Sequence, residues 1–118
     1  MKTEVMLHPR CPIRTALELI GGKWKLLIVQ SIGNQALRLY QIRAALPDIS
    51  EKMLIQELKN LCETGLVERH NYGEVPPRVE YQLTELGRLA LPLIGNLADF
   101  GIQYEQKRVF SARQPLPN

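Results

Sequence analysis

The sequence predicts a mainly α-helical fold with one small antiparallel β-hairpin, and three observations lead to this prediction. Apolar residues recur at steps of three and four through most of the chain, which is the spacing of one helix face. Between residues 66 and 83 this period gives way to two short segments typical of strands, and a turn-rich stretch at 70–77 separates them. The 118 residues have the length of one domain, which we expect to comprise an arm (1–9), a core (10–107) and a loose tail (108–118).

Two helices are expected before residue 35. Pro12 suits the first position of a helix that Cys11 caps and Gly21-Gly22 ends. A second helix is expected from about Lys23 to the stop at Gly33-Asn34. The residues with helical spacing are Ile13, Ala16, Leu17 and Ile20 in the first helix, and Trp24, Leu27, Ile28 and Ile32 in the second.

The central segment predicts two more helices in close succession. A very short strand at 37–39 leads into a short helix marked by Leu39, Ile42 and Leu46, which must end before a proline. Ser50 is a good N-cap for the next helix, and Gly65 ends it. Its expected core face consists of Leu54, Leu58 and Leu61, and its exposed positions are Glu51, Lys52, Gln56, Lys59 and Asn60.

The hairpin is followed by a long C-terminal helix. The strands are expected at 66–69 and 79–83, and the helix begins with Thr84 and Glu85. Pro92 removes a backbone donor, so the helix axis should bend near Arg88. The seam of this helix alternates steps of four and three, as in helix–helix packing, and we predict a dimer interface formed by Leu86, Leu93, Leu97, Phe100 and Tyr104.

Composition excludes several classes of protein. Hydrophobic residues make up 45% and charged residues 23%, which are the values of a globular protein, and no apolar run is long enough for a membrane span. We therefore expect a cytoplasmic protein. Two cysteines and two histidines are too few for a disulfide scaffold or a four-ligand zinc site, so no metal is expected. No phosphate-binding glycine loop or paired histidines occur, so we expect neither an enzyme nor a cofactor.

The order of elements is that of a winged helix-turn-helix, in which one helix enters the major groove of double-stranded DNA and the hairpin lies alongside. Residues 19–47 contain four basic residues and no acidic one, which suits a surface along phosphates. The helix at 50–64 is the candidate recognition helix, although its net charge of −1 (two lysines against three glutamates) is an objection. The predicted DNA-binding residues are Arg38, Tyr40, Ser50, Lys52, Gln56, Lys59, Arg69 and Arg78.

Several blocks of residues closely resemble the HxlR family of winged-helix regulators, relatives of the MarR family, over roughly residues 10–105. The most specific are Gly-Gly-Lys-Trp at 21–24 and Glu-Val-Pro-Pro-Arg-Val-Glu-Tyr at 74–81. The others are Cys11-Pro12, Leu-Ile at 19–20, Leu-Leu-Ile at 26–28, Ala-Leu-Pro at 45–47, Ile-Ser at 49–50, Gly-Leu-Val-Glu-Arg at 65–69 and Leu-Thr-Glu-Leu-Gly at 83–87. The resemblance implies a transcriptional regulator that forms a homodimer through its terminal helices and binds pseudo-palindromic DNA.

Two residues depart from the family pattern. Tyr40 stands where the family usually has a small polar residue at the start of the first helix of the motif, so a helix cap worth about 0.5–2 kcal/mol is expected to be missing there, or the Tyr40 hydroxyl offers a hydrogen bond to a phosphate. Glu57 stands where a basic residue is common, which puts a DNA contact at that position in doubt.

The resemblance also implies a switch, because some members sense oxidants or electrophiles through a cysteine just before the first helix, the place of Cys11. A thiolate there would be stabilised by the helix dipole, with Arg10 and Arg14 adding positive charge, whereas Cys62 is expected to be a packing residue. Two alternatives stay open: a small apolar effector bound at the dimer interface, and a winged helix that binds protein instead of DNA.

Overall fold

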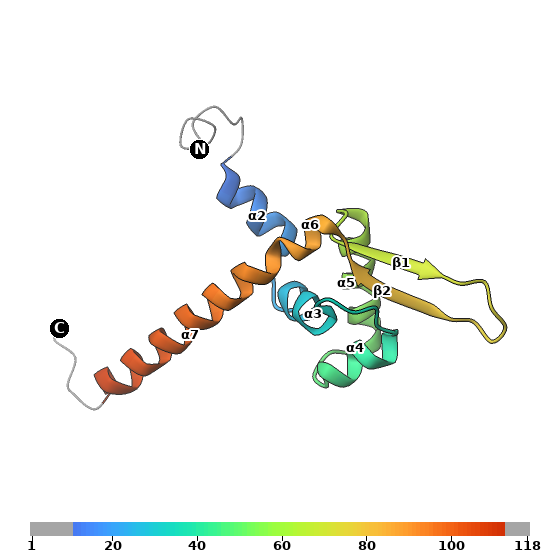
Figure 1. The fold of residues 1–118 in the computed structure, drawn as a ribbon. Helices are drawn as coiled ribbons and strands as arrows, with labels where there is room; N and C mark the ends of the chain where they lie inside the picture. The colour runs from blue at the N-terminus through green and yellow to red at the C-terminus, as the bar shows by residue number, and fades with distance from the viewer. Residues whose placement is uncertain (1–10, 113–118) are drawn as a thin grey trace.

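The structure is a computed structural model that describes the backbone of residues 11–112 and the side chains of residues 11–109. The expected arm at 1–9 and the residues after 112 lie outside this part of the chain. Figure 1 shows the described elements in order, and the fold is the predicted one, mainly helical with a two-stranded antiparallel sheet. The elements are α2 (Pro12–Ile20), α3 (Lys25–Ile32), α4 (Leu39–Ala45), α5 (Glu51–Glu63), β1 (Val67–Asn71), β2 (Val79–Leu83), α6 (Glu85–Arg88) and α7 (Ala90–Ala112).

The core lies around α3, which contacts α4, α5, α7 and β2. Helix α3 is apolar on most of its surface, and Ile28, Val29 and Ile32 are completely buried. The predicted core face of α5 is confirmed, because Leu54, Leu58 and Leu61 are at most 1% exposed. Trp24 packs against this core, as expected of an anchor. The buried apolar residues are Ile28, Val29, Ile32, Ile42, Ile49, Leu54, Leu58, Leu61, Leu66, Val67 and Leu83.

Both ends of α5 are fixed by local hydrogen bonds. The Ser50 hydroxyl oxygen accepts from the backbone N–H of Met53 at 3.1 Å, so the predicted N-cap is confirmed. At the other end Gly65 has φ +84°, the left-handed conformation that favours glycine. The N–H groups of Gly65 and Leu66 donate to the carbonyls of Cys62 and Leu61, which closes the helix with a Schellman motif.

The hairpin pairs β1 with β2 in antiparallel register, with Val67 opposite Leu83 and Asn71 opposite Val79. At the tip, the Asn71 side chain accepts from the backbone N–H of Gly73 at 2.9 Å. The short strand expected at 37–39 is wrong as a strand, since only Leu37 pairs, in a single bridge to Tyr81. Burial does not alternate along β2, because residues 79–82 are all half-buried.

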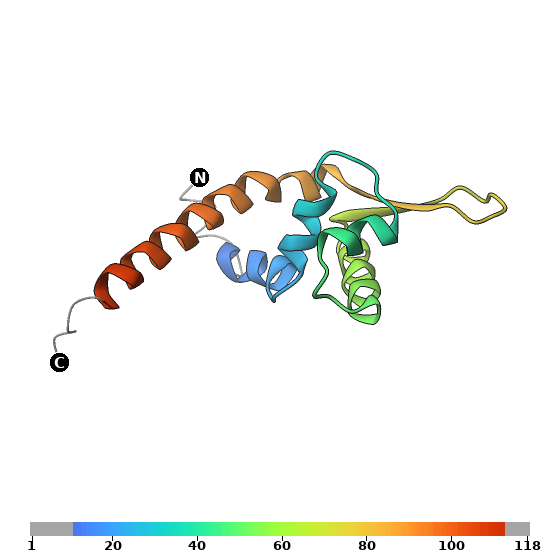
Figure 2. The same cartoon turned by 90° about the horizontal axis from the view of Figure 1, so that it is seen from below.

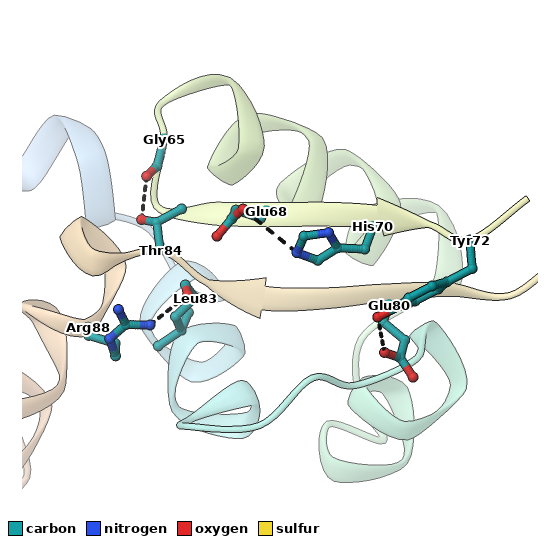
Figure 3. A network of polar contacts seen from close by, with 8 residues as sticks. All are labelled: Gly65, Glu68, His70, Tyr72, Glu80, Leu83, Thr84 and Arg88. Carbon is teal, nitrogen blue, oxygen red and sulfur yellow. Dashed lines mark hydrogen bonds and ion pairs between the residues drawn. The ribbon is translucent and has the colours of Figure 1, made fainter.

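The C-terminal helix bends where Pro92 predicts, and Leu89 separates α6 from α7. The Thr84 hydroxyl links this bend to the hairpin, because it donates to the carbonyl of Gly65 at 2.6 Å (Figure 3). The same hydroxyl oxygen accepts from the N–H of Gly87 at 3.0 Å. Arg88 donates to the carbonyl of Leu83 at 3.1 Å. Helix α7 continues to Ala112, so a loose tail from residue 108 is wrong as far as 112; residues 113–118 lie outside the described residues.

The molecule is elongated. Its Cα radius of gyration is 18.1 Å, against about 13 Å for a compact domain of 100 residues. Helix α7 leaves the body on one side and the hairpin leaves it on the other, which both Figure 1 and Figure 2 show. Helix α2 lies beside the start of α7, and apolar residues of both helices line shared grooves. In a single chain, many of the apolar residues of α7 are therefore exposed.

Candidate functional site

An arginine cleft lies where α4, the first residue of α5 and the base of the hairpin meet. The cavity has a volume of about 360 Å³ and an open mouth. Two basic residues, Arg38 and Arg43, line it together with one acidic residue, Glu51. The remaining lining residues are Leu39, Tyr40, Pro77 and Val79. Of the predicted DNA-binding residues, the structure brings Arg38 and Tyr40 together here, and it adds Arg43.

The start of α4 corrects the expectation for Tyr40. The N-cap of α4 is Arg38, and Tyr40 is the second residue of the helix, so no cap is missing at Tyr40. The Gln41 side chain accepts from the backbone N–H of Arg38 at 2.8 Å, which satisfies the reciprocal half of a capping box. Tyr40 lines the cleft and is 66% exposed.

The exposed side of α5 carries the predicted polar residues. Lys52, Gln56 and Lys59 are exposed and lie on the side of the helix away from the buried leucines; Asn60 and Glu51 are exposed too, and Glu51 lies at the arginine cleft. Sequence reasoning missed two apolar residues on the same helix: Met53 is 38% exposed and Ile55 is 48% exposed. Ile55 lies three residues after Lys52 and four before Lys59, so it interrupts a basic surface with an apolar side chain.

Glu57 is removed from the exposed surface of α5 by an ion pair. Its Oε2 lies 2.8 Å from Nζ of Lys25, and the two side chains are 19% and 17% exposed. The other charged residues of α5 are two lysines and two glutamates. Lys25 on α3 therefore neutralises the one excess negative charge of the helix. Lys25 is correspondingly unavailable to a phosphate. The pairing joins residues far apart in sequence, and no local pattern predicts it.

The hairpin carries two arginines predicted to contact DNA, and one of them, Arg78, is paired with neighbouring side chains of the hairpin. The Arg78 guanidinium lies 3.2 Å from Glu74 and 3.9 Å from Glu80, and its carbon is 3.9 Å from the centre of the Tyr72 ring. The Tyr72 hydroxyl donates to Glu80 at 2.9 Å, a hydrogen bond that raises the pKa of Tyr72 (Figure 3). Arg69, in contrast, is exposed and has no ion pair among the described residues.

Cys11 is exposed at the N-terminus of α2. The backbone N–H groups of Arg14 and, to a smaller extent, Ile13 lower the pKa of the Cys11 thiol below its ordinary value, although the thiol makes no full capping hydrogen bond. The largest cause is the N-terminus of α2 itself; Arg10, whose charge the sequence suggested, lies outside the described residues. Burial raises the pKa of Cys62, which packs against the core, as expected of a packing residue.

An apolar surface follows α2, α6 and α7. The predicted interface residues Leu86, Phe100 and Tyr104 are 59%, 69% and 55% exposed, and Leu93 and Leu97 are 36% and 44% exposed. Leu93 and Leu97 line a groove of about 590 Å³ together with Ile13 and Leu17 of α2, which are themselves 70% and 62% exposed. Such a continuous exposed apolar surface is typical of an interaction site.

No helix within 11–112 is long and apolar enough to span a membrane. Over the same residues, no three histidine, cysteine or acidic side chains are grouped so that they could hold a metal ion.

The comparisons with known proteins agree with this architecture. Residues 19–109 match the model of the HxlR-like helix-turn-helix family. The chain is 38% identical to YdeP, an HTH-type transcriptional regulator of Bacillus subtilis, over 82% of this chain and 76% of YdeP. It also resembles a solved structure from Porphyromonas gingivalis assigned to the MarR family of transcriptional regulators, with 48% identity, a TM-score of 0.76 and coverage of 80% and 93% of the two chains.

A third similarity is to the redox regulator HypR in its oxidized form, with 36% identity and a TM-score of 0.73 over 79% of this chain and 96% of HypR. Residues 19–109, which match the family model, include α3 to α6 and most of α7; these elements carry the arginine cleft, the hairpin and the part of the apolar surface that lies on α6 and α7. The chain therefore belongs to the HxlR-like helix-turn-helix family of transcriptional regulators.

Proposed function

We propose that this regulator binds double-stranded DNA, with the exposed side of α5 in the major groove and the arginine cleft along the adjoining phosphates. The observation that carries the proposal is the placement of Arg38 and Arg43 at the cleft, next to the N-terminus of α5. Arginine suits this role because its planar guanidinium forms paired hydrogen bonds with phosphate oxygens. Lys52, Gln56 and Lys59 on α5 then face the base edges, and Ser50 faces the backbone.

We further propose that the protein acts as a homodimer. The apolar surface of α2, α6 and α7 supports this, because water would otherwise cover Leu86, Leu93, Leu97, Phe100 and Tyr104. A two-fold dimer places two copies of α5 about 34 Å apart, one turn of DNA, and so binds a pseudo-palindromic operator.

Cys11 is the proposed switch. Its accessible thiol and lowered pKa favour the thiolate, which is the form that reacts with oxidants and electrophiles. The similarity to HypR, a redox regulator, supports the same role. Modification at the start of α2 would act on DNA binding through the neighbouring groove, which α2 shares with α7.

The direct test compares variants that remove the cleft arginines with a matched loss of charge elsewhere. Arg38→Ala and Arg43→Ala should each weaken binding to the operator and lower the slope of log affinity against log salt by about 0.9. Lys107→Ala, which removes one positive charge from exposed α7, should leave the slope unchanged. Equal slopes for all three variants and the wild type would contradict a phosphate site at the cleft.

A second candidate is control by a small apolar effector, and the 590 Å³ groove between α2 and α7 is the observation that favours it. An effector bound there would release DNA from a Cys11→Ser variant as well as from the wild type. Release that requires Cys11 would instead assign the signal to the thiol.

A further inference from the structure

The ion pair between Lys25 and Glu57 joins the helix at the centre of the core to the middle of α5. Lys25 is the first residue of α3, and the pair is 2.8 Å long with both side chains more than four-fifths buried. We propose that this pair is a positioning element that sets the orientation of α5 on α3, and that neither residue contacts DNA. The proposal rests on the proposed function, because it assigns to α5 the DNA-facing surface whose orientation the pair fixes.

The position of Glu57 along α5 supports this role. Leu54, Leu58 and Leu61 anchor one face of α5 through apolar packing, which is non-directional and leaves rotation of the helix about its axis weakly specified. The ion pair at the edge of that face holds Oε2 of Glu57 within 2.8 Å of Nζ of Lys25 on α3, so it fixes one point of α5 and selects one rotation. Rotation moves Lys52, Gln56 and Lys59 relative to the groove, and base contacts tolerate little displacement.

Electrostatics alone makes the opposite prediction, which sharpens the test. Glu57→Lys adds positive charge to the DNA-facing helix and would strengthen binding to any DNA if net charge were decisive. If the pair positions α5, the same change places two cations together and displaces the helix, so binding to the operator weakens. Glu63→Lys is the matched control, since it makes the same change of charge at the exposed end of α5, away from Lys25.

The experiment measures fluorescence anisotropy with DNA from the protein's own upstream region and with a scrambled duplex of equal length. We expect Lys25→Glu and Glu57→Lys each to weaken operator binding roughly tenfold without weakening binding to the scrambled duplex. The charge-swapped double variant K25E/E57K should recover most of the loss, and Glu63→Lys should show none. Lys25→Met should leave the salt slope of the wild type unchanged, because Lys25 touches no phosphate.

The proposal is overturned if the double variant binds the operator no better than either single variant. It is also overturned if Lys25→Met lowers the salt slope by about 0.9, the value expected for one lost phosphate contact. If a charge reversal prevents folding, Lys25→Met and Glu57→Gln remove one charge each and are compared with the K25M/E57Q double variant. Urea unfolding of the same set measures the coupling of the pair without DNA. Failure of the wild type to bind the operator would refute the proposed function. If the two substitutions have additive effects on the free energy of unfolding in urea, the positioning role of the ion pair is refuted instead.

Discussion

The two arginines of the hairpin have different surroundings, and these assign them different roles. Arg78 is held by Glu74 and Glu80 and stacked on Tyr72, so contact with DNA would require two carboxylates to give it up. Arg69 is exposed on β1 and has no such competitor among the described residues. At the level of sequence both arginines flank the hairpin equally, and only the fold distinguishes them.

Arg69→Ala is therefore expected to lower the salt slope of DNA binding by about 0.9, whereas Arg78→Ala leaves it nearly unchanged. Arg78→Ala should instead loosen the hairpin, which faster hydrogen exchange of the backbone N–H of Tyr72 would report, since that group donates to the carbonyl of residue 78. If Arg78→Ala lowers the salt slope as much as Arg69→Ala does, DNA displaces both carboxylates from Arg78.

The pH at which Cys11 reacts is a second test at this scale. The thiolate fraction grows as pH rises through the pKa, so a lowered pKa moves the onset of reaction to lower pH. Iodoacetamide should alkylate Cys11 with a midpoint at lower pH than the thiol of an unstructured cysteine peptide. Cys62, whose pKa burial raises, should react later and only at higher pH. The profile is followed by mass spectrometry of peptides, with Cys11→Ser as the control; a midpoint at or above that of the unstructured peptide would contradict the thiolate switch.

Ile55 allows a test of whether α5 recognises thymine bases in the operator. An exposed isoleucine between Lys52 and Lys59 can contact the methyl group of thymine in the major groove. Ile55→Ala should weaken binding to the operator, and replacement of thymine by uracil in the operator should weaken the wild type but not the variant. Equal losses for both proteins on the uracil operator would place the methyl contact elsewhere.

At the scale of elements, Thr84 joins the hairpin to the C-terminal helices. Its hydroxyl satisfies the carbonyl of Gly65 and the N–H of Gly87, and a Cβ on Gly87 would clash with the backbone carbonyl of Leu66. The hairpin and α6 are therefore fastened as one unit, so a shift of α6 in the dimer carries the hairpin with it.

Thr84→Ala removes both hydrogen bonds and should lower the free energy of unfolding by about 1–2 kcal/mol, as measured by urea denaturation. Thr84→Ser retains the hydroxyl and should lose much less. Equal losses in the two variants would assign the effect to the methyl group and its packing, and would refute the fastening role of the hydroxyl.

The bounds of the elements follow closely from local sequence signals, and the departures have identifiable causes. Ser50, Gly65 and Pro92 mark ends and a bend that depend only on neighbouring backbone groups, so their effects were predictable. The strand expected at 37–39 reduced to one bridge because its pairing depends on the distant Tyr81. Helix α7 continues to Ala112, beyond its expected end, and no helix-breaking residue stands between residue 108 and Pro115 to mark where it ends.

At the scale of the whole molecule, the candidate site was only partly predictable. Exposure of Lys52, Gln56 and Lys59 follows from helical period, whereas the ion pair of Lys25 and the capture of Arg78 depend on tertiary packing. Arg43 was missed as a site residue because nothing in the sequence indicates that α4 meets the base of the hairpin.

The dimer is tested by placing a charge within the apolar surface. Leu97→Glu would bury a carboxylate among apolar side chains if two copies meet there, so the variant should elute as a single chain in size-exclusion chromatography with light scattering. Gln106→Glu, half a turn around α7, adds a carboxylate away from that row and should leave the dimer intact. A dimeric Leu97→Glu variant would contradict this interface.

The central claim, specific binding of DNA through phosphates and base edges, is tested most directly by fluorescence anisotropy of the wild-type protein. The measurement uses DNA from its own upstream region and a scrambled duplex, each at 50 and 200 mM salt. We expect tighter binding to the upstream DNA and, for 6–10 phosphate contacts, a loss of affinity of roughly 10³–10⁵ between the two salt concentrations. Binding that is equal for both duplexes, or indifferent to salt, would contradict it and favour a module that binds protein.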